Sequence, residues 1–101
     1  MVFLYITCKD TDEAKTIGRE LVAKKAAACV NIAPIHSMYP EDGTIRETSE
    51  ASLLVKTIES KVQHVEEIVR AMHSYTIPCI ASFSLYRLNR EYKDWLIGKV
   101  A

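Results

Sequence analysis

The sequence has little glycine, little proline and no surplus of charge. Its 101 residues include three glycines and three prolines, and 13 Lys and Arg balance 13 Asp and Glu. The chain contains no glycine-rich phosphate-binding loop and no G-x-S-x-G nucleophile motif. Proteins that bind nucleic acid usually carry a basic surplus, because their affinity comes mainly from displaced counterions. The composition therefore argues against a phosphate-loop enzyme and against a nucleic-acid partner.

Long hydrophobic runs are also missing. The stretch over 1–6 has no basic region and no long apolar segment, so we expect no signal peptide, no membrane span and a cytoplasmic location. The three cysteines, Cys8, Cys29 and Cys79, are odd in number, widely spaced and without a C-x-x-C pair. This pattern argues against a disulfide framework and against a zinc knuckle.

The residues that are present describe one folded domain, which we place at 1–101. Apolar residues make up 49% of the chain and charged residues 26%. Periodicity and turn signals predict strands over 3–8, 28–39, 44–57 and 79–87, and helices over 11–27 and 60–73. A short closing helix follows Asn89, which can cap it. This β-α-β-β-α-β order is α+β and predicts a ferredoxin-like fold.

Both long helices begin with the spacing of a capping box. Asp10 and Glu13 lie three residues apart at the start of the first helix. Ser60 and Gln63 repeat this spacing at the start of the second. In a capping box the first side chain accepts a free backbone N–H of the helix, and the second reaches back toward the preceding residue. We therefore expect side-chain caps at Asp10 and Ser60.

The second and third strands form a long hairpin. Only the turn Pro40–Gly43 separates them, and arms of about 12 residues extend roughly 40 Å at about 3.3 Å per residue. The first and last strands are shorter, so the far ends of the hairpin have no neighbour in their own sheet. Unpaired edges invite pairing with another chain. We expect a homo-oligomer in which the hairpin crosses between subunits; the alternative is a monomer with a shorter, frayed hairpin.

The strand over 44–57 alternates between apolar and polar residues. Its apolar face contains Ile45, Ala51, Leu53 and Val55. Its polar face contains Arg46, Thr48, Glu50, Ser52 and Lys56. Such alternation is typical of a strand with one face against a core.

Few side chains are candidates for chemistry. A Cys–His catalytic pair could be assembled from Cys29 or Cys79 with His36, His64 or His73. All three cysteines, however, fall on predicted strands, where a small buried side chain is the usual role. His64 and His73 are nine positions apart, too far for an H-x-x-x-H metal site. His73 is the best single candidate for a metal ligand, because imidazole suits copper, zinc or nickel and the thiol of Cys79 would favour a soft metal. The alternative is a helix-end histidine that interacts with the helix dipole.

An ordered set of motifs resembles the CutA divalent-cation tolerance family. The motifs are Ala27-Ala28-Cys29-Val30-Asn31-Ile32, Ser37-x-Tyr39, Gly43-x-Ile45, Glu50 with Leu53-Leu54-Val55-Lys56-Thr57, His73-x-Tyr75-x-x-Pro78 and Tyr92-x-x-Trp95-Leu96. Together they span nearly the whole chain. The resemblance implies a ferredoxin-like protomer, a tight homotrimer built by strand pairing between subunits, a cytoplasmic setting and association with divalent metals, copper in particular.

The resemblance also implies a site at a cleft between subunits. Residues expected to line the cleft are Tyr39, Glu50, Lys56, Tyr75 and Trp95, and the resemblance gives His73 as a metal ligand. Cys79, a thiol where the family usually has a carboxylate, is the second ligand that we expect, on the chemistry of its side chain. Some family members bind copper through a cysteine of the first strand. This chain has Ile6 at that position, and Cys8 follows two residues later.

The function that we expect is a non-enzymatic trimer linked to divalent metal binding and tolerance, with no cofactor required for folding and no membrane or nucleic-acid partner. The alternative is a PII-like trimeric sensor of a small ligand, or a signalling scaffold, that uses Lys56 and Arg87 to hold an anion. A PII-like protein needs a long loop between the second and third strands, where this chain has a four-residue turn.

Overall fold

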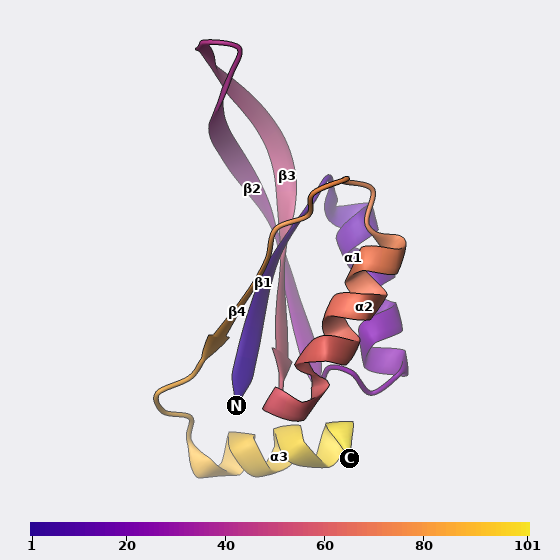
Figure 1. Ribbon diagram of the computed structural model, residues 1–101. Coiled ribbons are helices and arrows are strands. Elements are labelled where there is room, and N and C mark those ends of the chain that lie inside the picture. Colours follow the sequence, from indigo (N-terminus) through magenta and orange to yellow (C-terminus); the bar gives the residue numbers. More distant parts are fainter.

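The structure is a computed structural model that describes all 101 residues. Two helices cover one face of a four-stranded antiparallel sheet, and a third lies across one end of it (Figure 1). The elements are β1 (Val2–Cys8), α1 (Thr11–Ala23), β2 (Cys29–Glu41), β3 (Thr44–Thr57), the 3₁₀ turn η1 (Glu59–Lys61), α2 (Val62–Met72), β4 (Ile80–Ser84) and α3 (Arg90–Val100). The strand order β2-β3-β1-β4 confirms the α+β, ferredoxin-like expectation.

The start of α1 follows the predicted capping box. Oδ1 of Asp10 accepts the backbone N–H of Glu13 at 2.8 Å, and the Glu13 carboxylate accepts the N–H of Lys9 at 3.0 Å. The helix ends at Ala23, four residues earlier than expected, because Lys25 adopts a left-handed conformation with φ of 57°.

The start of α2 differs from the prediction. Ser60 lies inside η1, and α2 begins at Val62 without a side-chain cap. The expected cap at Ser60 is therefore wrong. The residues just before α2 close a tight 3₁₀ turn, in which the N–H of Lys61 bonds to the carbonyl of Ile58.

The core lies between the sheet and the two covering helices. Its largest fully buried side chains from the strands are Leu4, Ile6, Leu53 and Val55, and those from α1 and α2 are Ile17, Leu21, Val65 and Val69.

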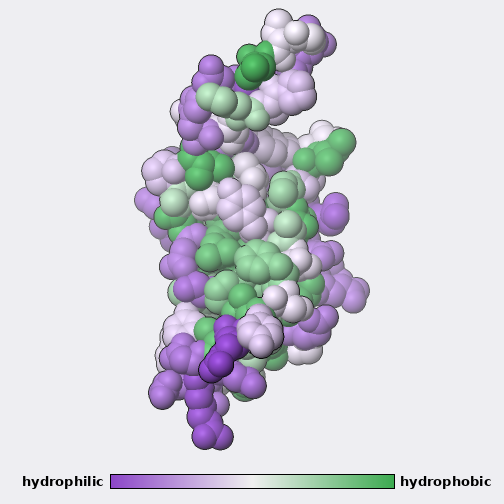
Figure 2. Space-filling view, turned by 90° about the vertical axis from the view of Figure 1, so that its left-hand side faces the viewer, coloured by the Kyte–Doolittle hydropathy of each residue, from purple (hydrophilic) through white to green (hydrophobic).

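Only 19 of the 101 residues are buried, so the two layers leave much apolar surface uncovered. Apolar side chains gather across the face of the sheet that has no helix over its middle (Figure 2). Tyr5 and Phe83 are exposed there, and the rings of Phe3 and Phe83 meet edge to face.

The long hairpin is confirmed and is even longer than expected. β2 and β3 pair continuously from Cys29 with Lys56 to Glu41 with Thr44. Only Asp42 and Gly43 form the turn, both with positive φ, as a two-residue hairpin turn requires. β1 stops at Cys8 opposite Ala51, so residues 44–50 of β3 have a strand partner on one side alone.

The last strand is shorter than predicted. β4 spans Ile80–Ser84, because its partner β1 begins at Val2, opposite Ser84. Cys79 therefore precedes the strand and is exposed, contrary to the expectation of a buried strand position. Asn89 precedes α3 as expected, but its side chain donates to Glu91 and makes no capping bond to the backbone.

Candidate metal site

His73 is fixed where α2 ends and the chain returns over the end of β1. Its side chain is fully buried. Nε2 lies 2.7 Å from the carbonyl oxygen of Thr7, and Nδ1 accepts the backbone N–H of Tyr75 at 3.0 Å. These partners assign the ring proton to Nε2. The ring thus contacts β1 and the following loop, and not the last carbonyls of α2.

Glu13 stands beside this histidine with a side chain that is only 7% exposed. Oε1 accepts the N–H of Lys9 and Oε2 accepts the N–H of Ser74, both at 3.0 Å, and Oε1 lies 3.9 Å from Nε2 of His73. Burial is the largest single influence on its pKa and acts to raise it. The hydrogen bonds from Lys9 and Ser74, with the nearby His73, outweigh burial and lower the pKa below its usual value. The carboxylate is therefore charged at neutral pH.

Cys8 completes the cluster from the last position of β1. Burial, followed by the charges of Glu13 and Asp10, raises the pKa of the thiol to about 12. The free side chain is thus a thiol at neutral pH, which excludes Cys8 as a ready nucleophile. The ligand atoms of Cys8, Glu13 and His73 all lie within 4.8 Å of one another.

This donor set fits a metal ion of intermediate or soft character. Imidazole nitrogen and thiolate sulfur suit copper and zinc, and a carboxylate can serve as the third ligand. The ion would displace the thiol proton of Cys8, as metals do when a thiol coordinates. One ring nitrogen of His73 would also exchange its hydrogen bond, to Thr7 or from Tyr75, for the metal.

The expected cleft residues form two separate groups within one chain. The hydroxyl of Tyr75 donates to Oε2 of Glu50 at 2.6 Å. Burial first, then this hydrogen bond and the Glu50 charge, raise the pKa of Tyr75, and Tyr39 contributes in the same direction. Because Tyr75 follows His73 by two residues, this group adjoins the metal cluster.

The second group lies near α3. Nζ of Lys56 is 5.6 Å from the ring centre of Phe3 and 5.5 Å from that of Tyr92, whose ring is 5.3 Å from that of Trp95. Lys56 lies six positions along β3 from Glu50, which corresponds to roughly 20 Å. No single site within one chain unites the two groups.

Comparison with known proteins decides the family. A sequence model described as "CutA1 divalent ion tolerance protein" matches residues 2–99. The chain belongs to the CutA1 family. Relatives named divalent-cation tolerance protein CutA include one from Archaeoglobus fulgidus, 44% identical over 93% of this chain and 92% of its own length. Another, from Thermus thermophilus, is 42% identical over 90% and 89%.

Solved CutA structures share the whole architecture. The Archaeoglobus fulgidus protein, described as a periplasmic divalent cation tolerance protein, has a TM-score of 0.94 at 42% identity and full coverage of both chains. The CutA1 structure from Ehrlichia chaffeensis has a TM-score of 0.95 at 29% identity, over 99% of this chain and 94% of that one. The family resemblance of the sequence motifs is thus confirmed. No helix of this CutA1 chain is long and apolar enough to span a membrane.

Sequence reasoning identified only part of the cluster in this CutA1 chain. His73 was an expected ligand, whereas Cys8 and Glu13 were not assigned to a metal. Cys79, the other expected ligand, is exposed and stands outside the group of three. One available signal was the capping box, because Glu13 must turn back toward the end of β1, where Cys8 lies.

Proposed function

We propose that this CutA1 chain binds a divalent cation, copper before other metals, through His73, Cys8 and Glu13. The observation that carries the proposal is the convergence of a nitrogen, a sulfur and an oxygen ligand within 4.8 Å. The family's description as divalent ion tolerance proteins agrees with it. We propose a role in binding and not in catalysis, in keeping with the family's description by ion tolerance; the buried thiol of Cys8, with its raised pKa, is no ready nucleophile.

Titration with Cu(II) under anaerobic conditions tests the metal site. The wild-type chain should bind one ion per protomer, and His73→Ala should abolish most of the affinity. Cys8→Ser and Cys79→Ser form a matched pair of thiol substitutions. We expect the first to weaken binding by more than about a hundredfold, since losing an outer-shell partner of a ligand already costs about ten- to a hundredfold, and the second to leave it unchanged. Equal affinity in wild type and His73→Ala would overturn the site; a loss in Cys79→Ser alone would transfer the sulfur ligand to Cys79.

We further propose that the chain forms a homotrimer by strand pairing between subunits. Three features support it: the one-sided partnering of residues 44–50, the free outer edges of β2 and β4, and the uncovered apolar face of the sheet in Figure 2. Two different edges that pair with each other form a heterologous contact, which closes into a ring when the rotation permits. Light scattering should give about three times the 11.4 kDa protomer, and a mass of one protomer would refute the assembly.

The trimer gives the two groups of cleft residues a common role. We assign Tyr39, Glu50 and Tyr75 of one subunit and Lys56 and Trp95 of a neighbour to one cleft beside the metal site.

The PII-like alternative gains no support, because the hairpin turn has only the two residues Asp42 and Gly43. We also propose a cytoplasmic location, consistent with three free cysteines, which fractionation of cells that express the protein would test.

A further inference from the structure

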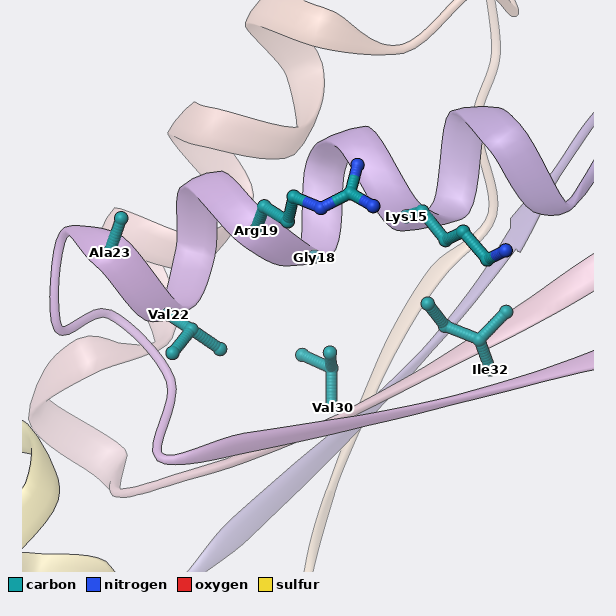
Figure 3. A pocket seen from close by; sticks show the side chains of 7 residues that line it. All are labelled: Lys15, Gly18, Arg19, Val22, Ala23, Val30 and Ile32. Atoms are coloured by element: carbon teal, nitrogen blue, oxygen red, sulfur yellow. The ribbon is translucent and has the colours of Figure 1, made fainter.

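A groove of about 510 Å³ lies between α1 and the edge strand β2, and none of its lining residues belongs to the metal cluster. Figure 3 shows the lining residues. Val22 reaches into it from α1, and Val30 and Ile32 reach into it from β2. Lys15 and Arg19 of α1 are the only charged residues of its lining. Its volume falls in the range of about 300–1,000 Å³ typical of small-molecule sites, which combine an apolar wall with a few polar groups.

Gly18 fixes the base of the groove. A Cβ atom at this position would lie 3.0 Å from Cγ2 of Val30 and 3.6 Å from Cδ1 of Leu53. The absence of a side chain therefore lets α1 approach β2 closely at its middle. The groove is closed toward the core by this contact, and in the single protomer it is open toward solvent, where Val22 is 43% exposed.

The two cations beside the groove have no partner within the chain. Neither Lys15 nor Arg19 takes part in any of the four ion pairs, whereas Lys24, on the same helix, pairs with Glu20 at 3.7 Å. Lys15 and Arg19 are four residues apart, a spacing at which like charges repel and weaken a helix. An anion placed between them would relieve this repulsion.

We propose that the groove binds a small amphipathic carboxylate. Its apolar chain lies on Val22, Val30 and Ile32, and its carboxylate lies between Lys15 and Arg19. The chemistry follows from the lining, which supplies an aliphatic wall and two unpaired cations with no acid. The proposal does not depend on metal binding, because no residue of the groove belongs to the cluster at His73.

Titration of the full chain with decanoate tests this site, followed by amide chemical shifts and by calorimetry. Shift changes should gather at residues 15–32. Decan-1-ol, which has the same chain without the charge, should bind wild type about three- to tenfold more weakly than decanoate does. Decanoate should bind the double variant Lys15→Gln/Arg19→Gln more weakly than wild type by the same factor. Two exposed ion pairs account for a change of this size. The double variant Lys61→Gln/Arg70→Gln removes the same charge outside the groove and should bind decanoate like wild type.

Three results would overturn the proposal. The first is an absence of decanoate-induced shifts at residues 15–32, as expected if a second copy of the chain covers the groove. The second is equal binding of decanoate and decanol to wild type, which would indicate apolar adhesion alone. The third is an equal loss of decanoate binding in the two double variants, which would indicate an effect of net charge and not of a site.

Discussion

The two halves of β3 belong to one continuous strand, yet they have opposite surroundings. In residues 51–57, β1 and β2 flank the strand, the helices cover one face, and every second residue is fully buried. In residues 44–50, β2 is the only neighbour, and Ile45 is 75% exposed. Ile45 was predicted to share the apolar face of Leu53. The difference teaches that alternation gives the direction of a side chain, while burial depends on whether a second layer covers that face.

The upper half of the hairpin, residues 35–50, is held by the pairing of β2 with β3 alone. His36 lies 2.7 Å from Glu47, and Arg46 lies 3.3 Å from Glu41, both at exposed positions. Exposed ion pairs contribute little, and a two-stranded ribbon is marginal in water. The upper half therefore depends on the lower half, or on another subunit, for its order.

The prediction with the largest expected effect compares Leu53→Ala in the covered half of β3 with Ile45→Ala in the uncovered half. Leu53 is fully buried, so its truncation should lower the free energy of unfolding by about 2–5 kcal/mol. Ile45→Ala should cost less than about 0.5 kcal/mol while the chains are monomeric, because its side chain is already in water. Urea unfolding at several protein concentrations measures both changes.

The concentration series sharpens that test. If the trimer covers the upper hairpin, Ile45→Ala should become costly only at concentrations where light scattering detects the assembly. Equal losses for the two variants in dilute, monomeric samples would contradict the division of β3 into a covered and an uncovered half.

A second prediction concerns pH at the end of β1, where the upper half of the hairpin begins. The pKa of Glu13 is lowered in the fold, so its charged form stabilises the protein above the usual carboxyl range, and this stability is lost as the pH falls through the lowered value. Glu13→Gln should therefore destabilise the protein by about 1–3 kcal/mol at pH 7, and the difference from wild type should shrink toward pH 3. Unfolding curves across that range measure it.

Glu66→Gln is the matched control, because Glu66 of α2 makes no hydrogen bond or ion pair. It should change stability by less than about 0.5 kcal/mol at either pH. A Glu13→Gln effect that is small, or that persists unchanged at pH 3, would refute the role of the charged carboxylate.

Local patterns in the sequence predicted β3 to the residue and the start of α1, because alternation, a turn and a cap each act within a few positions. The end of α1 could not be predicted, since Lys25 is a non-glycine residue in a left-handed conformation. His73 was found from its place at a helix end and from its motif. Its partners were missed because the ring bonds Thr7, 66 residues away, and only the completed sheet and helices bring them together.

The smallest predicted effect lies where the two halves of β3 meet. The hydroxyl of Tyr75 donates to Glu50, the last residue before the buried half, and so ties the loop after His73 to the hairpin. Tyr75→Phe should lower the free energy of unfolding by about 0.5–1.5 kcal/mol, the usual net worth of one hydrogen bond. Tyr39→Phe is a close control, because Tyr39 is equally exposed, at 38% against 37%, and its hydroxyl makes no hydrogen bond.

A double-mutant cycle of Tyr75→Phe with Glu50→Gln isolates the contact. We expect a coupling of about 0.5–1 kcal/mol, since the two side chains meet directly and neither is fully buried. Coupling near zero, or an equal loss in Tyr39→Phe, would mean that the hydrogen bond does not join the loop to the hairpin. The order of the upper hairpin would then depend on strand pairing alone, within the chain or with a neighbouring subunit.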